Sequence, residues 1–431
     1  MLYLSTRQQS PALSLSQALA RGLAPDGGLY VPERLPQFDP SDFDGRTHLA
    51  EIAETLLAPF CADDPLADAL SDLCRRALDP PLALTTLPGD QDDHLLELFH
   101  GPSAAFKDFA ARFLAECLAH GRAPDTPELT ILVATSGDTG AAVAAAFHRR
   151  PGFRVVILYP EGRVSPRQAH MLGALGDNVS CLRVAGRFDD CQALAKQALA
   201  DADLRQRRPL SSANSISLGR LLPQMAYYAW AALHFQRQRG EPLNFAIPTG
   251  NLGNALAAVL ARTLGLPIGE IVLACNDNRS LTEFFAGNAY RPRPSVATLA
   301  NAMDVGDPSN FERLRWLIPD PEHLRRALRA VSVDDPAIRR RLAVVAERGA
   351  IVCPHTATAL DVIADLRASG DRRPWAAVAT AHPAKFEQVL SAAIGHAPEP
   401  PAALQAWLAR PDASEPIACH YPTLAERLAR P

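Results

Sequence analysis

The stretch TILVATSGDTG, residues 130–140, joins an apolar, β-branched run to a glycine-bearing loop, and an alanine-rich segment follows it up to Phe147. A β-branched run of this length is typical of a buried strand, and the segment after it has helical spacing. The same order of strand, glycine loop and helix returns over residues 243–264. Such alternation predicts doubly wound parallel sheets with helices on both faces, in which ligands bind at the carboxyl ends of the strands.

Further predicted strands continue this alternation after residue 150, whereas the first 90 residues do not follow it. Further apolar runs are predicted to be strands at 154–159, 179–184, 271–274, 350–353 and 375–379. Residues 1–90 read differently, as a small and mainly helical domain with helices expected at 14–22, 47–60 and 65–77. The polar run GDQDD at 89–93 is the expected boundary.

The composition, charge and cysteine spacing of the chain disfavour several classes of protein. The chain has 431 residues and a formal net charge of −4, without the basic patch of a nucleic-acid-binding protein. No apolar run approaches the roughly 20 residues of a membrane span, and the first residues do not resemble a signal peptide. Eight cysteines include no C-x-x-C pair, and Cys353 and His355 do not belong to a four-ligand zinc spacing. We therefore expect a soluble, cytoplasmic protein with reduced thiols, no bound metal, and no membrane or nucleic-acid partner.

Lysine is confined to positions 107, 196 and 385, so chemistry that needs a primary amine has three candidates. Lys107 is expected in the first turn of a helix that Ser103 caps and Gly121 ends. There, partial burial and the helix dipole would both lower the pKa of its amine. A surface lysine with a buried stem is the alternative. Lys196 reads as a solvated helix position, whereas Lys385, close after a predicted strand, remains a candidate.

One loop has the features of a phosphate site. It stands between a strand and a helix, where its glycines let backbone N–H groups converge on an anion, and it consists of Thr249, Gly250, Asn251, Leu252, Gly253 and Asn254. It lacks the Gly-Lys-Ser/Thr of a P-loop and the spacing of a dinucleotide fingerprint, which disfavours a kinase or dehydrogenase. A tight strand-to-helix turn is the alternative.

Three other polar sites follow predicted strands. Ser136, Gly137, Asp138 and Thr139 offer hydroxyls and backbone donors suited to a carboxylate, although any helix cap uses the same residues. Ser212 and Asn214 belong to a second cluster, for which a plain polar loop is the alternative. Thr380 places a hydroxyl at the end of the last strand. An amine, a phosphate loop, a carboxylate loop and this hydroxyl together make up the equipment of a pyridoxal-phosphate enzyme.

The motifs also resemble those of the threonine synthase family, in its bacterial and fungal branch with an extra N-terminal domain. The matching segments span most of the chain: GGLYVP (27–32), GPSAAFKDF (101–109), ATSGDTGAA (134–142), SANSI (212–216), NAMDVG (301–306) and TAHPAKF (380–386). The resemblance implies a fold of the tryptophan-synthase β type (fold type II). It has a helical domain at 1–90, a large cofactor-binding domain at 91–125 and 240–431, and a small mobile domain at 126–239.

The resemblance also implies roles for the residues. Lys107 would form a Schiff base with pyridoxal 5'-phosphate, residues 249–254 would hold the cofactor phosphate, and Thr380 would meet the pyridine nitrogen. Ser136, Gly137 and Thr139 would face the substrate carboxylate, and Asp138 would lie by the phenolic oxygen of the cofactor, where many relatives of the wider fold have asparagine.

The reaction implied is conversion of O-phospho-L-homoserine and water to L-threonine and phosphate, by a monomer or homodimer. A pyridoxal-phosphate phospho-lyase or hydroxyamino-acid dehydratase of the same fold is an alternative, as is a non-catalytic ligand-binding homologue. The substrate brings a second phosphate, for which Arg163 and Ser165 after the strand at 154–159 are candidates. Ser212 and Asn214 are the second choice for this phosphate.

Overall fold

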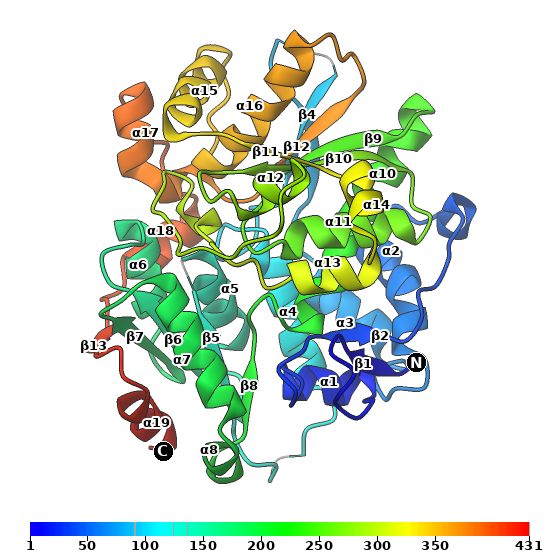
Figure 1. Ribbon diagram of the computed structural model, residues 1–431. Helices are drawn as coiled ribbons and strands as arrows, with labels where there is room; N and C mark the ends of the chain where they lie inside the picture. The colour runs from blue at the N-terminus through cyan, green and yellow to red at the C-terminus, as the bar shows by residue number, and fades with distance from the viewer. Residues whose placement is uncertain (90–91, 124, 136, 431) are drawn as a thin grey trace.

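The computed structural model describes residues 1–89, 92–123, 125–135 and 137–430. One mainly parallel sheet, one fully parallel sheet and a helical N-terminal region form its framework (Figure 1). The first residues form a short hairpin of β1 (Tyr3–Ser5) and β2 (Tyr30–Pro32). The helices of this region are α1 (Leu15–Arg21), η1 (Pro40–Phe43), α2 (Leu49–Leu57), η2 (Ala58–Cys61) and α3 (Leu70–Ala77). As expected, Ser14 caps α1 and Gly22 ends it.

The larger sheet has the strand order β11-β10-β9-β12-β4-β3 in the described residues. Its strands are β3 (Ala83–Thr86), β4 (Asp93–Glu97), β9 (Leu243–Pro248), β10 (Ile268–Cys275), β11 (Arg329–Ser332) and β12 (Trp375–Ala379). Every neighbouring pair is parallel except β3 and β4. β12 is central and buried at every position, which explains its continuous run of apolar residues.

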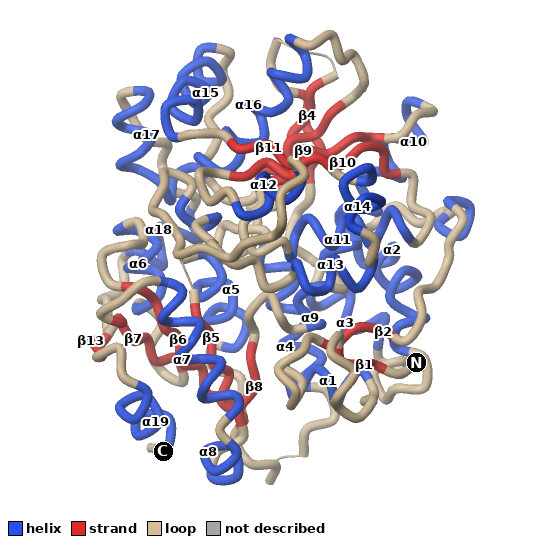
Figure 2. The backbone as a smooth tube through the Cα atoms, viewed as in Figure 1, coloured by secondary structure: helices blue, strands red, loops and turns tan. Residues whose placement is uncertain are grey.

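Helices pack around this sheet and connect its strands (Figure 2). Those that precede β10 are α4 (Lys107–Ala119), α9 (Leu218–Leu221), α10 (Gln224–Arg239) and α11 (Gly253–Thr263). Those that follow β10 are α12 (Ser280–Phe285), η3 (Asn301–Met303), α13 (Phe311–Leu317), α14 (Pro321–Ala327), α15 (Asp335–Glu347), α16 (Pro354–Ala368), η4 (Pro383–Phe386) and α17 (Glu387–Ile394). The next helix, α18 (Ala402–Leu408), packs instead on the helix Pro166–Gly173 beside the smaller sheet.

The smaller sheet is fully parallel, with the order β13-β7-β6-β5-β8. Its strands are β5 (Leu129–Ala134), β6 (Phe153–Pro160), β7 (Val179–Val184), β8 (Leu210–Ser212) and β13 (Glu415–Ile417). Its helices are α5 (Asp138–Phe147), α6 (Pro166–Gly173), α7 (Phe188–Ala200), α8 (Ala202–Arg207) and α19 (Tyr421–Ala429). Ile131 packs into the core on the α5 face, whereas Leu132 packs with α7 and α19 on the other. This alternation confirms the doubly wound architecture.

Two local predictions were wrong. Residues 350–353 form no strand; Val352 and Cys353 are buried in cores just before α16, so burial and not strand pairing accounts for this apolar run. Ser103 does not cap α4, because that helix begins at Lys107 with Phe106 as its N-cap. The backbone N–H of Ser103 instead donates to the Asp108 carboxylate, 2.9 Å away.

The sheets also divide the chain differently from the predicted domain ranges. β3 adds to the large sheet although it falls within residues 1–90. β13 pairs with β7 and α19 packs on α7, so residues 415–429 join the small domain and not the large one. A three-residue strand such as β13 leaves too short a pattern to be predicted. Within the described residues, no helix combines the length and apolar character needed to cross a membrane.

Candidate active site

An open cavity with about 840 Å³ of empty space, part of which is open solvent at its mouth, lies where the two sheets present the carboxyl ends of their strands. Residues after β5, β9 and β12 line it, together with the first residue of α4. The cavity therefore lies where an α/β sheet is expected to bind its ligand.

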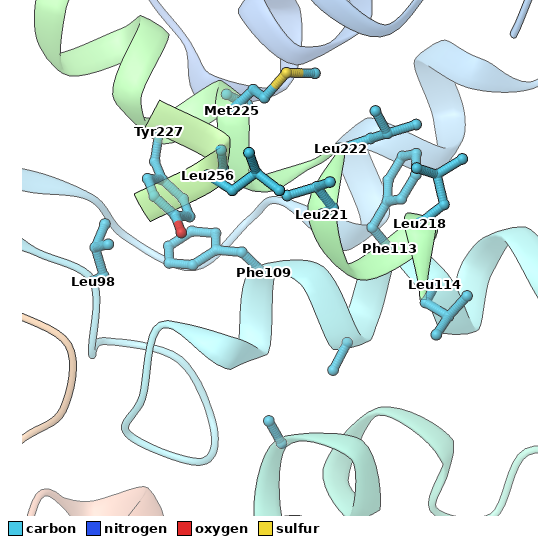
Figure 3. Close-up of a cluster of buried hydrophobic side chains, with 14 of the residues drawn as sticks. Leu98, Phe109, Phe113, Leu114, Leu218, Leu221, Leu222, Met225, Tyr227 and Leu256 are labelled. Atoms are coloured by element: carbon cyan, nitrogen blue, oxygen red, sulfur yellow. The ribbon is translucent and has the colours of Figure 1, made fainter. Parts of the chain in front are cut away.

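Lys107 lies at the start of a helix, α4, that is packed against its neighbours. Apolar side chains of α4 pack against α9 and α10, with Phe109, Phe113 and Leu114 facing residues such as Leu221 and Tyr227 (Figure 3). The loop before α4 is tied to the end of β12: the Phe106 N–H donates to the Thr380 carbonyl at 2.9 Å. Lys107 and Thr380 are thus held in a fixed relation by backbone pairing.

The surroundings of Lys107 favour its neutral amine more than water favours the neutral amine of a free lysine side chain. Burial lowers the pKa of Lys107 to about 8; Asp138 opposes this effect, while Lys385 and Arg220 add to it. The Nζ atom lies 3.8 Å from Asp138 Oδ2 and 4.5 Å from the centre of the Phe106 ring. An amine of this pKa is partly neutral near physiological pH and can act as a nucleophile or a base.

Asp138, the first residue of α5, is buried and ionised. Its Oδ1 lies 2.6 Å from Lys385 Nζ and accepts a hydrogen bond from Gln168 Nε2 at 2.8 Å. Burial alone would raise the pKa of Asp138, but Lys385 and Lys107 hold it well below its usual range. The preceding residue must be glycine, because Gly137 has a φ of +135° and a Cβ there would come within 2.9 Å of the Gln168 side chain.

The loop between β9 and α11 forms a cradle of neutral donors. A Cβ on Gly250 would lie 2.7 Å from Met303 Cα, so only glycine allows this close approach. Asn254 Oδ1 accepts hydrogen bonds from the hydroxyls of Tyr227 at 2.6 Å and Tyr228 at 2.8 Å. Asn254 lines the cavity, and its buried Nδ2 has no hydrogen-bond partner among the described residues. The unpaired donor at a helix N-terminus fits a bound phosphate, as pyridoxal phosphate requires.

Arg220 and Ser215 also line the cavity, and the sequence analysis did not select either of them. Arg220 is buried; its Nη1 donates to the Ala213 carbonyl, and its Nε has no partner among the described atoms. Burial lowers the pKa of Arg220 to about 10, so the guanidinium remains charged at neutral pH. Ser215 Oγ accepts a hydrogen bond from Asn251 Nδ2 at 2.5 Å. The sequence signal was available in SANSISLGR, residues 212–220, where the arginine follows the polar cluster directly.

His355 is a further lining residue, and in the sequence it stands out only beside Cys353 as an incomplete zinc spacing. Its Nε2 accepts the Ala302 N–H at 3.1 Å. Burial lowers the pKa of His355 to about 4, against the opposing effect of Asp138, so the ring is neutral at physiological pH. No cluster of His, Cys, Asp or Glu in the described part of the chain is arranged to hold a metal ion.

Most residues predicted to contact ligands meet at this cavity. Those that line it are Lys107, Asp138, Thr139, Asn214, Thr249, Gly250, Asn251, Leu252, Gly253, Asn254 and Thr380. Ser212 lines a smaller adjoining pocket that shares Asn214 and Asn251 with the cavity. Ser136 lies outside the described residues.

Arg163 and Ser165 lie elsewhere. Arg163 is exposed and borders a separate pocket with Arg187 and Phe188, of which Phe188 also lines the main cavity. Ser165 caps α6, and its hydroxyl donates to the Lys385 carbonyl at 3.0 Å. Neither residue is among those that line the main cavity in the described structure.

Comparison with known proteins identifies the family. Residues 95–384 match the family model for pyridoxal-phosphate-dependent enzymes, and residues 2–78 and 356–423 match those for the threonine synthase N terminus and C-terminal region. The chain is 37% identical to threonine synthase of Escherichia coli (strain K12) over 90% of each chain. It is 36% identical to that of Pseudomonas aeruginosa, over 94% of this chain and 93% of the relative.

Solved structures agree with this result. The crystal structure of threonine synthase from Escherichia coli superposes with a TM-score of 0.91 at 34% identity, covering 99% of both chains. Pyridoxal-phosphate-bound threonine synthase from Brucella melitensis gives a TM-score of 0.87 at 33% identity, covering 100% of this chain and 99% of the other. The amine, the phosphate cradle and these similarities lead to one conclusion: the chain belongs to the threonine synthase family of pyridoxal-phosphate-dependent enzymes.

Proposed function

We propose that the chain converts O-phospho-L-homoserine and water to L-threonine and inorganic phosphate. One observation carries the proposal: the same cavity is lined by an amine of lowered pKa and by two sets of anion donors, one around Asn254 and one around Arg220. A phosphorylated amino-acid substrate on a phosphorylated cofactor needs two such sets. Membership of the threonine synthase family supports this choice of substrate.

Residues of the large domain would hold the cofactor. Lys107 Nζ would bind it covalently, the N–H groups and Asn254 Nδ2 at 249–254 would hold its phosphate, and Thr380 would meet its ring nitrogen. Asp138 is proposed to lie by its phenolic oxygen. When bound, pyridoxal phosphate supplies an electron sink that stabilises negative charge developing on substrate carbon atoms.

The chain itself supplies proton transfer and orientation. Once the substrate amine has displaced it, Lys107 Nζ would take the proton from the substrate Cα, a role suited to an amine whose pKa is near 8. The loop at 136–139 would orient the substrate carboxylate with donors at the start of α5. A second proton would leave Cβ as phosphate departs from Cγ. A proton would then return to Cγ, the hydroxide of water would bond to Cβ and a proton would return to Cα, which balances the overall reaction.

For the substrate phosphate we propose Arg220 with Ser215, Asn214 and Asn251, because Arg220 is the buried guanidinium that lines the cavity. A guanidinium binds phosphate oxygens with paired, charge-assisted hydrogen bonds. Arg163 and Ser165, the sites predicted from sequence, are retained as the competing assignment, in which closure of the small domain carries them over the cavity.

The two assignments predict different kinetics. Arg220→Gln should raise the KM for O-phospho-L-homoserine by roughly 10-fold to 100-fold, the value of one or two charged hydrogen bonds. Arg163→Gln and Ser165→Ala should each leave KM within about twofold of the parent. Steady-state kinetics, with cofactor absorbance as the check on folding, decide between them. A large effect of Arg163→Gln with none from Arg220→Gln would favour the competing assignment.

A product assay tests the function itself. Purified protein given O-phospho-L-homoserine should release phosphate and threonine in equal amounts. Release of 2-oxobutyrate would instead indicate the phospho-lyase, and 2-oxobutyrate from threonine the dehydratase. Absence of any reaction by cofactor-loaded protein would indicate the non-catalytic homologue. We place the enzyme in the cytoplasm, a proposal supported by eight cysteines that are all free, seven of them buried.

A further inference from the structure

Lys385 is a buried cation to which the mechanism above gives no role. It lies in η4, five residues after Thr380, and its side chain is 0% exposed. Its Nζ donates to the Ser103 carbonyl at 2.9 Å and lies 2.6 Å from Asp138 Oδ1. A lysine is almost never buried so completely unless it is paired, so this contact needs an explanation.

The contact divides the two oxygen atoms of Asp138 between different partners. Lys385 and Gln168 occupy Oδ1, whereas Oδ2 faces Lys107 at 3.8 Å. One carboxylate therefore lies between two ammonium groups, and the closer of them is Lys385. This arrangement fixes the orientation of Asp138 and keeps it ionised.

The same contact connects parts of the chain that are remote in sequence. Lys385 and the Ser103 loop flank Lys107 in the large domain, whereas Asp138 begins α5 of the small domain. A buried carboxylate without its cation would carry a large desolvation penalty, so the position of Asp138 depends on Lys385. The groups whose charge affects Lys107 are Asp138, Lys385, Arg220 and Cys353, and His355 lines the same cavity.

We propose that Lys385 is a positioning residue of the active site, which holds Asp138 ionised and oriented so that Oδ2 faces Lys107. The pair has no net charge, so Asp138 can lie beside the bound cofactor without an uncompensated carboxylate in the cavity. Lys385 also competes with Lys107 for the attraction of Asp138 and thereby keeps the amine of Lys107 more acidic. The proposal deepens the function above, since it rests on Lys107 as the residue that binds the cofactor.

The scarcity of lysine makes this measurable on the full chain freed of cofactor. Trace acetylation with acetic anhydride as a function of pH, followed by peptide mapping, reports the neutral fraction of each lysine separately. Exposed Lys196 serves as the internal standard. Lys196→Met, which removes an exposed amine that does not line the main cavity, is the matched control and should leave the profile of Lys107 unchanged.

Replacing Lys385 and replacing Asp138 should shift the pKa of Lys107 in opposite directions. Lys385→Met removes a competing cation, so the pKa of Lys107 should rise and its labelling at pH 7 should slow by about tenfold for a one-unit shift. Asp138→Asn removes the attracting anion, so labelling at pH 7 should quicken by about fivefold for a shift of one unit. General damage to the fold would expose Lys107 and move both variants the same way. Equal profiles in all variants, or shifts of the same sign, would overturn the proposal.

Thermal unfolding gives an independent readout. Lys385→Met alone leaves a buried carboxylate with fewer partners and should lower Tm, whereas Lys385→Met combined with Asp138→Asn should recover part of the loss. Additive effects of the two changes would contradict the coupling. Neither readout needs turnover, so failure to form threonine would reject the proposed function alone, and unchanged labelling would reject the role of Lys385 alone.

Discussion

The loops that follow β5 and β9 have the same place in their sheets but different chemistry. Each joins a buried parallel strand to a helix and lines the cavity. The loop after β9 presents neutral amides, and two tyrosine hydroxyls orient Asn254. The loop after β5 presents the carboxylate of Asp138, which a buried lysine neutralises. The backbone geometry thus supplies the location, and the side chains decide which charge each loop places beside the cavity.

The largest effect should come from removing the amine that the β5 loop faces. Lys107→Ala should lower turnover by roughly a thousandfold or more, because it deletes both the covalent anchor and the proton-transfer group. Borohydride reduction and peptide mapping should find the pyridoxyl label on Lys107 in the parent protein. Lys196→Arg is the control and should match the parent. A label on Lys196 or Lys385 would place the cofactor elsewhere.

Making the β9 loop resemble the β5 loop should have the next largest effect. Asn254→Asp keeps the acceptor for both tyrosine hydroxyls but places a negative charge where the cofactor phosphate is proposed. Cofactor affinity should fall by about 100-fold or more, since close like charges in a partly buried site repel by several kcal/mol. Asn254→Ala, which removes the donor without adding charge, should lower cofactor affinity by a smaller factor. Titration of cofactor-free protein by absorbance measures both. Equal losses would show that charge does not distinguish the loops.

Within the β9 loop, the two glycines should differ in importance. Gly250→Ala puts a methyl group 2.7 Å from Met303 Cα, whereas Gly253→Ala meets Ser215 Cβ at 3.3 Å. We expect Gly250→Ala to weaken cofactor retention by about tenfold, as one hydrogen bond of the cradle is lost. Gly253→Ala should be milder, and Gly253→Val worse than its alanine counterpart. The same titration checks the order. The reverse order would mean that the helix N-terminus makes the closer approach to the phosphate.

The smallest effect is the pH dependence of cofactor incorporation at Lys107, the amine that the β5 loop faces. Because the pKa of Lys107 is lowered to about 8, its neutral fraction grows as pH rises and levels off above pH 8. The rate of cofactor incorporation into cofactor-free protein should therefore rise about fivefold between pH 7 and pH 8 and change little above pH 9. Stopped-flow absorbance follows this rate. A rate that keeps rising through pH 10 would show an ordinary lysine.

Local patterns were enough to predict much of this molecule. The β-branched runs, the two glycine loops and the first helix were read from residues adjacent in sequence. Lys107, Asp138 and residues 249–254 were selected in the same way and line one cavity, while the roles assigned to them stay predictions. Each depends on strand-to-helix chemistry that a short window contains.

Features made by packing were not predictable in this way. Arg220 reaches the cavity from α9, and only the packing of that helix on α4 and α11 brings it there. The pairing of Asp138 with Lys385 joins residues 247 positions apart. Residues 350–353 carried a strand pattern because Val352 and Cys353 are buried and their two predecessors partly so, and periodicity alone does not distinguish burial from strand pairing.

The position of β13 has a consequence for the biogenesis of the protein. β13 covers the outer edge of β7, yet Glu415 follows Val184 by 231 residues. At a synthesis rate of about 5–20 residues per second, β7 would wait roughly 10–50 seconds for its neighbour. During that interval an unpaired strand edge is open to other nascent chains. Both sheets therefore keep an unpaired strand edge until late in translation, because β4 of the large sheet likewise waits for β12, whose Trp375 follows Glu97 by 278 residues.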